Sequence, residues 1–105
     1  MYQLRIYTID SEEAMRTYAH VHWRRHKESL KKFGVTTEAV FQSVKDENYY
    51  VIALVSYCED ADIQSVDEAF MNSRDFKADM EGFDFKHMRK VEGFVLDRVV
   101  EIAQK

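Results

Sequence analysis

Residues 49–58 read YYVIALVSYC, and this stretch decides the fold because it is apolar on both sides of an extended chain. Successive side chains of a strand point to opposite faces. One face carries Tyr50, Ile52 and Leu54, and the other carries Val51, Ala53, Val55 and Tyr57. A strand that is apolar on both faces is covered on both faces. Other parts of the structure must therefore pack against both faces of the sheet that contains this strand.

Three other segments show strand patterns. Tyr2–Ile9 alternates with period two, Val35–Val44 is rich in Val, Thr and Phe, and Val91–Val100 is mostly apolar. The polar residues 45–48 between the second and third strands predict a hairpin turn. The sequence thus predicts four strands, two of them joined directly.

Two segments favour helices. The first runs from Ser11, a good N-cap, to Phe33, with Gly34 placed to end it. We expect one unbroken α-helix there. The second begins at a capping box formed by Ser65 and Glu68 and continues to about Glu81. Asp84 is placed to cap a short turn that leads to Met88.

The predicted order βαββαβ is that of an α+β ferredoxin-like domain, a four-stranded antiparallel sheet with two helices on one face. One sheet face then stays bare, and a second copy packed sheet to sheet would cover it. We therefore expect a homodimer, with Arg5, Tyr7 and Tyr57 assigned to the dimer face. The alternative is a partly exposed aromatic sheet face.

Composition limits the possible functions. The chain has 105 residues, 46% hydrophobic and 32% charged, which fits a single domain over residues 1–105. Fifteen basic and nineteen acidic residues give 15 − 19 = −4, a poor charge for binding nucleic acid. Three glycines leave no phosphate-binding loop, and one cysteine leaves no internal disulfide. Without a signal peptide or a membrane-spanning run, we expect a cytoplasmic protein.

The candidate chemistry lies on the first helix, where His22 and His26 fall on the apolar stripe one turn apart. Two buried imidazoles would line a pocket and move a proton near neutral pH, or would pack in the core against backbone carbonyls or a Tyr. Tyr18 and Trp23 lie beside them as candidate pocket walls. The spacing lacks the Glu of HExxH and a third ligand, so we predict no bound metal. If the protein is an enzyme, we expect acid–base chemistry without a bound organic cofactor.

Several segments resemble the NIPSNAP family of the dimeric α/β-barrel superfamily over residues 2–100. They are Tyr18 together with YQLRIYTI (2–9), HWRRHKESLKKFGV (22–35), VIALVSY (51–57) and FMNSRDFKADMEGFD (70–84). The helical spacing is also similar to that of antibiotic-monooxygenase-type and EthD-type barrels. Tyr18 and His22 lie where L-rhamnose mutarotase-like chains place a Tyr and a catalytic His. The tryptophan-rich segment of those chains is replaced here by Asp75, Phe76 and Lys77.

The resemblance implies a homodimer with a pocket beneath the first helix of each subunit. Proteins with this fold include cofactor-free oxygenases, isomerases and proteins with structural roles, and the fold alone does not choose among them. We predict a pocket for a small oxygen-bearing molecule, with His22 and His26 as catalytic candidates and Tyr18 and Trp23 as ligand-binding ones. A cofactor-free monooxygenase or isomerase would fit. The alternative is a non-catalytic structural or interaction dimer.

Overall fold

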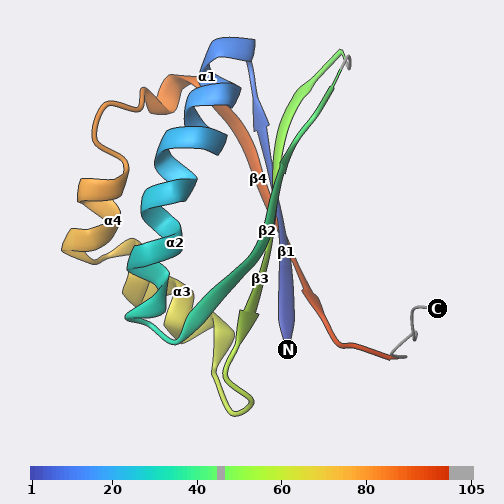
Figure 1. Ribbon diagram of the computed structural model, residues 1–105, viewed down its shortest axis with the longest axis vertical. Helices are drawn as coiled ribbons and strands as arrows, with labels where there is room; N and C mark the ends of the chain where they lie inside the picture. The colour runs from blue at the N-terminus through green and yellow to red at the C-terminus, as the bar shows by residue number, and fades with distance from the viewer. Residues whose placement is uncertain (45–46, 100–105) are drawn as a thin grey trace.

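The computed structural model describes residues 1–44 and 47–99 and contains one antiparallel sheet in the order β2-β3-β1-β4. The strands are β1 (Tyr2–Ile9), β2 (Val35–Gln42), β3 (Tyr49–Tyr57) and β4 (Met88–Leu96). All the helices lie on one face of the sheet, and the other face is bare (Figure 1). The ferredoxin-like α+β fold is thereby confirmed. The expected hairpin turn includes residues 45 and 46, which lie outside the described residues. The last strand was expected from Val91 to residue 100, which also lies outside them, but β4 begins earlier, at Met88, and ends at Leu96.

The first helical segment departs from the single α-helix expected over residues 12–33. It consists of α1 (Glu12–Thr17), a π-helical turn η1 (Tyr18–His22) and α2 (Trp23–Lys31). In the π turn the backbone N–H of Trp23 bonds to the carbonyl of Tyr18, five residues earlier. Ser11 caps the start through the N–H of Ala14, as predicted. The wider turn rotates every later side chain relative to an ideal α-helix.

The second helical segment is also divided. It begins at α3 (Ile63–Met71), where Asp62 rather than Ser65 is the N-cap and accepts the N–H of Ser65. The helix stops at Asn72, and Ser73 then caps a second short helix, α4 (Arg74–Asp79). The prediction of one helix from the Ser65 capping box was therefore wrong. Asp caps a helix as well as Ser does, so the helix begins after Asp62, three residues earlier than predicted.

The predicted cap at Asp84 is confirmed, since its carboxylate accepts the N–H of Lys86 at the start of the short 3₁₀ turn η2 (Phe85–His87). Gly34, with φ of +77°, follows α2 in a left-handed conformation. A Cβ at that position would also lie 3.3 Å from the sulfur of Cys58. These two turns return the chain to the sheet after the first and the second helical segment.

The two faces of the sheet can now be assigned. Val51, Ala53 and Val55 of β3 are fully buried beneath the helices. Arg5 lies opposite Ala53, and Tyr7 lies opposite Val51, so both point toward the helices. Tyr57 shares this face and is buried. The assignment of Arg5, Tyr7 and Tyr57 to a dimer face was therefore wrong. Side chains alternate between the two faces of a sheet, and these three share the face of Val51, which the helices cover.

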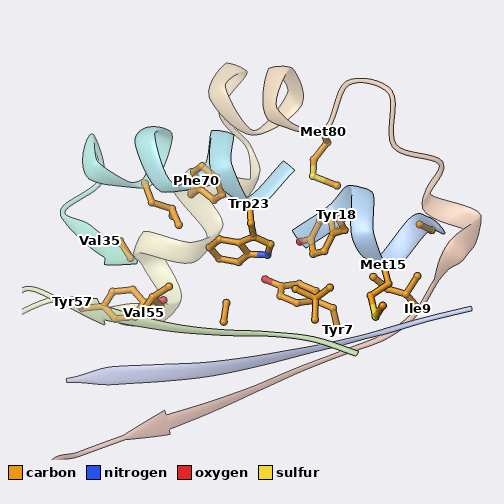
Figure 2. Packing of buried hydrophobic residues seen from close by; sticks show 14 residues of the cluster. Tyr7, Ile9, Met15, Tyr18, Trp23, Val35, Val55, Tyr57, Phe70 and Met80 are labelled. Carbon is orange, nitrogen blue, oxygen red and sulfur yellow. The ribbon is translucent and has the colours of Figure 1, made fainter. Parts of the chain in front are cut away.

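The bare face carries the alternate residues. Leu4, Ile6, Ile52 and Leu54 are partly buried there by their neighbours on the sheet. Phe41 is 57% exposed and Phe94 is 46% exposed on the same face. An apolar sheet face of this kind is commonly an interaction surface. The helix side, by contrast, is a packed core around Trp23, Tyr7 and Tyr18 (Figure 2).

Candidate functional site

Asp79, the last residue of α4, accepts hydrogen bonds from four side chains of the first helical segment. Its backbone carbonyl lies 2.7 Å from Nδ1 of His22 and 3.1 Å from Nη1 of Arg25. Its carboxylate lies 2.9 Å from Nδ1 of His26 and 2.9 Å from Oγ of Ser29. The donors follow one another at helical spacings of three, one and three residues, so they share one helix face. Asp79 thus fixes α4 against α2.

These contacts set the tautomer of His26. An ionised carboxylate only accepts hydrogen bonds, so Nδ1 of His26 carries the proton that points to Asp79. In the neutral ring the lone pair is then on Nε2. Nε2 has no hydrogen-bond partner among residues 1–44 and 47–99. His26 therefore combines a fixed orientation with an unused acceptor nitrogen.

Aromatic rings surround the imidazole of His26. Phe76 stacks on it with an interplanar angle of 2°, while Trp23, Phe70 and Tyr18 approach it edge to face. Burial lowers the pKa of His26, and this effect exceeds the opposing influence of the Asp79 carboxylate. The ring is therefore held neutral, which is the state in which Nε2 can accept a proton.

A cavity of about 250 Å³ lies between the helical layer and strands β1 and β4. Its apolar walls include Phe70, Phe76, Met80, Phe85, Met88 and Val91. Its polar lining includes Gln3, Arg5, Tyr7, Tyr18, His26 and Asp67. A largely apolar hollow with a few polar groups is the usual form of a small-molecule site.

Of the four residues singled out from the sequence, His26 and Tyr18 line this cavity, whereas His22 and Trp23 do not. His22 packs edge to face on Phe83, and its Nε2 is buried with no hydrogen-bond partner among the residues that the structure describes. Trp23, expected at the margin of the apolar stripe, is only 1% exposed. The π turn explains both positions, because it places Trp23 one wide turn above Tyr18 and rotates His22 toward α4.

Tyr18 and Tyr7 form the inner wall of the cavity. Their ring centroids are 4.9 Å apart, in an edge-to-face arrangement. Figure 2 shows both hydroxyl groups directed toward the indole nitrogen of Trp23, whose N–H makes no hydrogen bond within the described part of the chain. Burial and the adjacent Tyr7 raise the pKa of Tyr18 well above its usual value. Tyr18 therefore serves as a neutral hydrogen-bonding phenol.

A second polar cluster surrounds Arg5 at the β1 side of the cavity. Its Nε donates to Oε1 of Gln3 at 2.7 Å, and its Nη2 lies 2.9 Å from both Oη of Tyr57 and Oδ1 of Asp67. The hydroxyl of Tyr57 in turn donates to Oδ1 of Asp67 at 2.6 Å. Burial raises the pKa of Tyr57 to about 12, so this phenol stays protonated at neutral pH.

Asp79 and the Arg5 cluster were not identified as site residues from the sequence. Asp79 follows Phe76 by three residues and precedes Met80, so it lies within the apolar stripe of its helix. A charged residue in such a stripe signals a buried partner, and His26 with Ser29 on the facing stripe could have supplied it. Arg5 gave no comparable signal, because a strand pattern does not reveal which face meets the helices.

Two further properties concern the residues that the structure describes. Over residues 1–44 and 47–99, no three His, Cys, Asp or Glu side chains lie together as a metal site would require. The same residues include no helix of the length and apolar character needed to cross a bilayer.

Comparisons with known proteins show the same fold. The chain has a TM-score of 0.73 with a NIPSNAP domain protein from Burkholderia xenovorans, at 9% identity and over 98% of each chain. A protein from Agrobacterium tumefaciens gives 0.71 at 13% identity, over 93% of this chain and 92% of the other. A candidate antibiotic biosynthesis monooxygenase from Nitrosomonas europaea gives 0.64 at 13% identity, over 95% and 100%.

The expected likeness to NIPSNAP and antibiotic-monooxygenase-type proteins is thus confirmed for the fold. No family model matches the sequence, and no curated protein matches it either. At these identities the similarity lies in the chain path, and the candidate chemistry has to be argued from the residues of this chain.

Replacing Asp79 by Ala should lower the free energy of unfolding by about 3 kcal/mol, because it leaves the buried donors of His26 and Ser29 without acceptors. Urea denaturation followed by circular dichroism measures this change. Asp75→Ala is the matched control, since Asp75 is in the same helix and forms only a surface ion pair with Lys32. Equal losses in the two variants would contradict the role of Asp79.

The lowered pKa of His26 has a defined effect on stability. As pH falls below about 6.5, the unfolded chain binds a proton that the folded chain still excludes, so the free energy of unfolding decreases. NMR of the ring nitrogens should show His26 neutral with its proton on Nδ1 below that pH. The same sample in concentrated urea is the reference. A native His26 that titrates at or above its unfolded value would refute this prediction.

Proposed function

We propose that the protein binds a small apolar, oxygen-bearing molecule in the cavity and that His26 accepts a proton from it without an organic cofactor. The observation that carries this proposal is the His26–Asp79 pair. The carboxylate holds Nδ1 at 2.9 Å, and the ring lines an apolar cavity with Nε2 unpaired among the described residues. A general base needs this combination of orientation, neutrality and access.

The cavity volume limits the ligand. A cavity of about 150 Å³ accepts benzene, so about 250 Å³ has room for a molecule of one or two rings. Phe70, Phe76 and Met80 supply apolar contacts, while Tyr18 and Tyr7 offer hydroxyl groups to an oxygen atom. A cyclic ketone or an enolisable aromatic compound has both properties.

The proposed first step is removal of a proton from a carbon next to a carbonyl group. The C–H bond breaks, Nε2 of His26 gains the proton, and the electron pair moves to the carbonyl oxygen as an enolate. Hydrogen bonds from Tyr18 or Tyr7 would stabilise that oxygen. An isomerase would return the proton at another carbon. A monooxygenase would let the carbanion reduce O₂, converting a methylene to a ketone and releasing water.

In this proposal His22 has a different role from that of His26. Its Nδ1 bonds to the backbone carbonyl of Asp79, and it does not line the cavity. We infer that His22 positions Asp79 and so acts on His26 indirectly. The name of the Nitrosomonas neighbour agrees with oxygenase chemistry, but the likeness extends to the fold alone.

The bare sheet face favours a homodimer in which two sheets pack together. Phe94 and Leu96 of β4 and Phe41 of β2 leave apolar surface exposed on that face. This surface would also serve the second candidate function, a non-catalytic structural or interaction dimer. The location in a reducing cytoplasm stays a prediction from the sequence. The next two experiments separate catalysis from assembly.

The general-base role can be tested with 2-tetralone, a two-ring ketone with exchangeable protons beside its carbonyl. The protein should accelerate hydrogen–deuterium exchange of this compound in D₂O, measured by ¹H NMR. His26→Gln should slow the protein-dependent rate by about 100-fold or more. His20→Gln, an exposed position on the same helical segment, should leave it unchanged.

His22→Gln completes this experiment. Exchange that survives in His22→Gln and disappears in His26→Gln assigns the base to His26. The reverse pattern would overturn the assignment. If folded wild-type protein neither binds 2-tetralone nor accelerates its exchange, the proposed function fails for this ligand class and the structural dimer is favoured.

The dimer can be tested at two neighbouring positions of β4. Phe94→Glu places a charge on the bare face, so light scattering coupled to gel filtration should detect a monomer. Val95→Glu is the matched control, because Val95 is 57% exposed but points to the helix side of the sheet. A dimer that persists in Phe94→Glu would show that this face is not the interface.

A further inference from the structure

The cavity contains one basic side chain that the proposed proton transfer does not use, Arg5. This side chain is only 12% exposed and lines the cavity from β1. Its Nε and Nη2 are occupied by Gln3, Tyr57 and Asp67. Its remaining nitrogen, Nη1, makes no hydrogen bond to any residue in 1–44 or 47–99. Arg5 therefore offers unused N–H groups in a largely apolar hollow.

The three partners fix the position of the guanidinium group. Gln3 and Tyr57 are joined to each other as well as to Arg5, since the hydroxyl of Tyr57 lies 2.9 Å from Oε1 of Gln3. Asp67 accepts from the same nitrogen as Tyr57, Nη2, through its Oδ1. A planar guanidinium group held through Nε and Nη2 presents its third nitrogen, Nη1, to a ligand in a fixed orientation. The ligand would gain a charge-assisted hydrogen bond without ordering the side chain first.

The charges around Arg5 limit what that ligand can be. The acidic residues that line the cavity are Asp67 and Glu92. Glu92 belongs to the sheet face opposite that of Arg5, and its Oε2 lies 3.6 Å from Nζ of Lys90 on the same strand. Arg5 is the single Lys or Arg among the lining residues that the structure describes. One guanidinium group that is already paired with one carboxylate suits a monoanion. A phosphate dianion would need further positive charge.

We propose that Arg5 binds the carboxylate of an apolar monocarboxylic acid through Nη1. The head group lies against β1, and the ring system extends along Phe70 and Phe76 toward His26. This inference rests on the proposed function, because it takes the same cavity to be the ligand site. It goes beyond that function by defining the substrate class as small aromatic or cyclic aliphatic acids.

The test compares two probes of nearly equal shape, 2-naphthoate and the neutral ketone 2-acetonaphthone. Titration of the full chain by NMR should give a dissociation constant about tenfold or more lower for 2-naphthoate. Arg5→Gln should abolish this preference while 2-acetonaphthone still binds. Arg16→Gln is the matched control, since Arg16 is exposed and pairs with Glu12 within α1.

Asp67→Asn gives a second readout of opposite sign and covers the case in which Arg5→Gln does not fold. It removes the competing negative charge and retains an oxygen that can accept from Arg5. We expect 2-naphthoate to bind more tightly to this variant, with little change for the neutral ketone. A preference that is unaltered in Arg5→Gln, or an affinity that falls in Asp67→Asn, would overturn the inference.

The failures of the two proposals differ. If 2-acetonaphthone binds and 2-tetralone is exchanged but 2-naphthoate has no advantage, the assignment to Arg5 fails and the proposed function stands. If neither naphthalene probe binds and 2-tetralone is not exchanged, both proposals fail. A tenfold preference that is lost only in Arg5→Gln supports the carboxylate site.

Discussion

The attachment of α4 to α2 through Asp79 is the constraint on which the site depends. A six-residue helix such as α4 has little stability of its own, so its position has to come from tertiary contacts. Four donors on one face of the segment formed by η1 and α2 supply them, two to the carbonyl and two to the carboxylate. The same contacts bring Phe76 and Met80 over the sheet and orient His26. Structure and candidate chemistry therefore rest on one buried acidic residue.

His26 and Arg5 line the cavity from different layers of the fold, the helices and the sheet. His26 is surrounded by rings and paired with Asp79, whereas Arg5 is held among Gln3, Tyr57 and Asp67 on the sheet. The cavity that both residues line is walled mainly by apolar side chains. Because His26 and Arg5 are both largely buried, their hydrogen bonds to a ligand would be stronger than hydrogen bonds on the surface. A ligand with one polar head and a ring body matches this arrangement in both shape and charge.

The sequence was sufficient to predict four strands and their order along the chain, because each segment is rich in β-branched, aromatic or other apolar residues. It was also sufficient to place His26 on a buried stripe with Tyr18 beside it. It did not distinguish the two faces of the sheet, since β3 is apolar on both, and so Arg5 and Tyr57 were assigned to the wrong side. The π turn at Tyr18–His22 contains no Gly or Pro, so the sequence gives no signal that predicts it. Helical spacing counted through it therefore misplaced Trp23.

That π turn also affects how this helix can be aligned with its structural relatives. A π turn contains one residue more than the α turn it replaces, so a relative with a regular helix needs a gap within residues 18–22. Without that gap, each residue after the turn would be matched to the wrong neighbour in the relative. A functional histidine could then be transferred to His22 when its spatial equivalent is another residue. Superposition of backbones, rather than motif spacing, is the safer basis for equivalence in this helix.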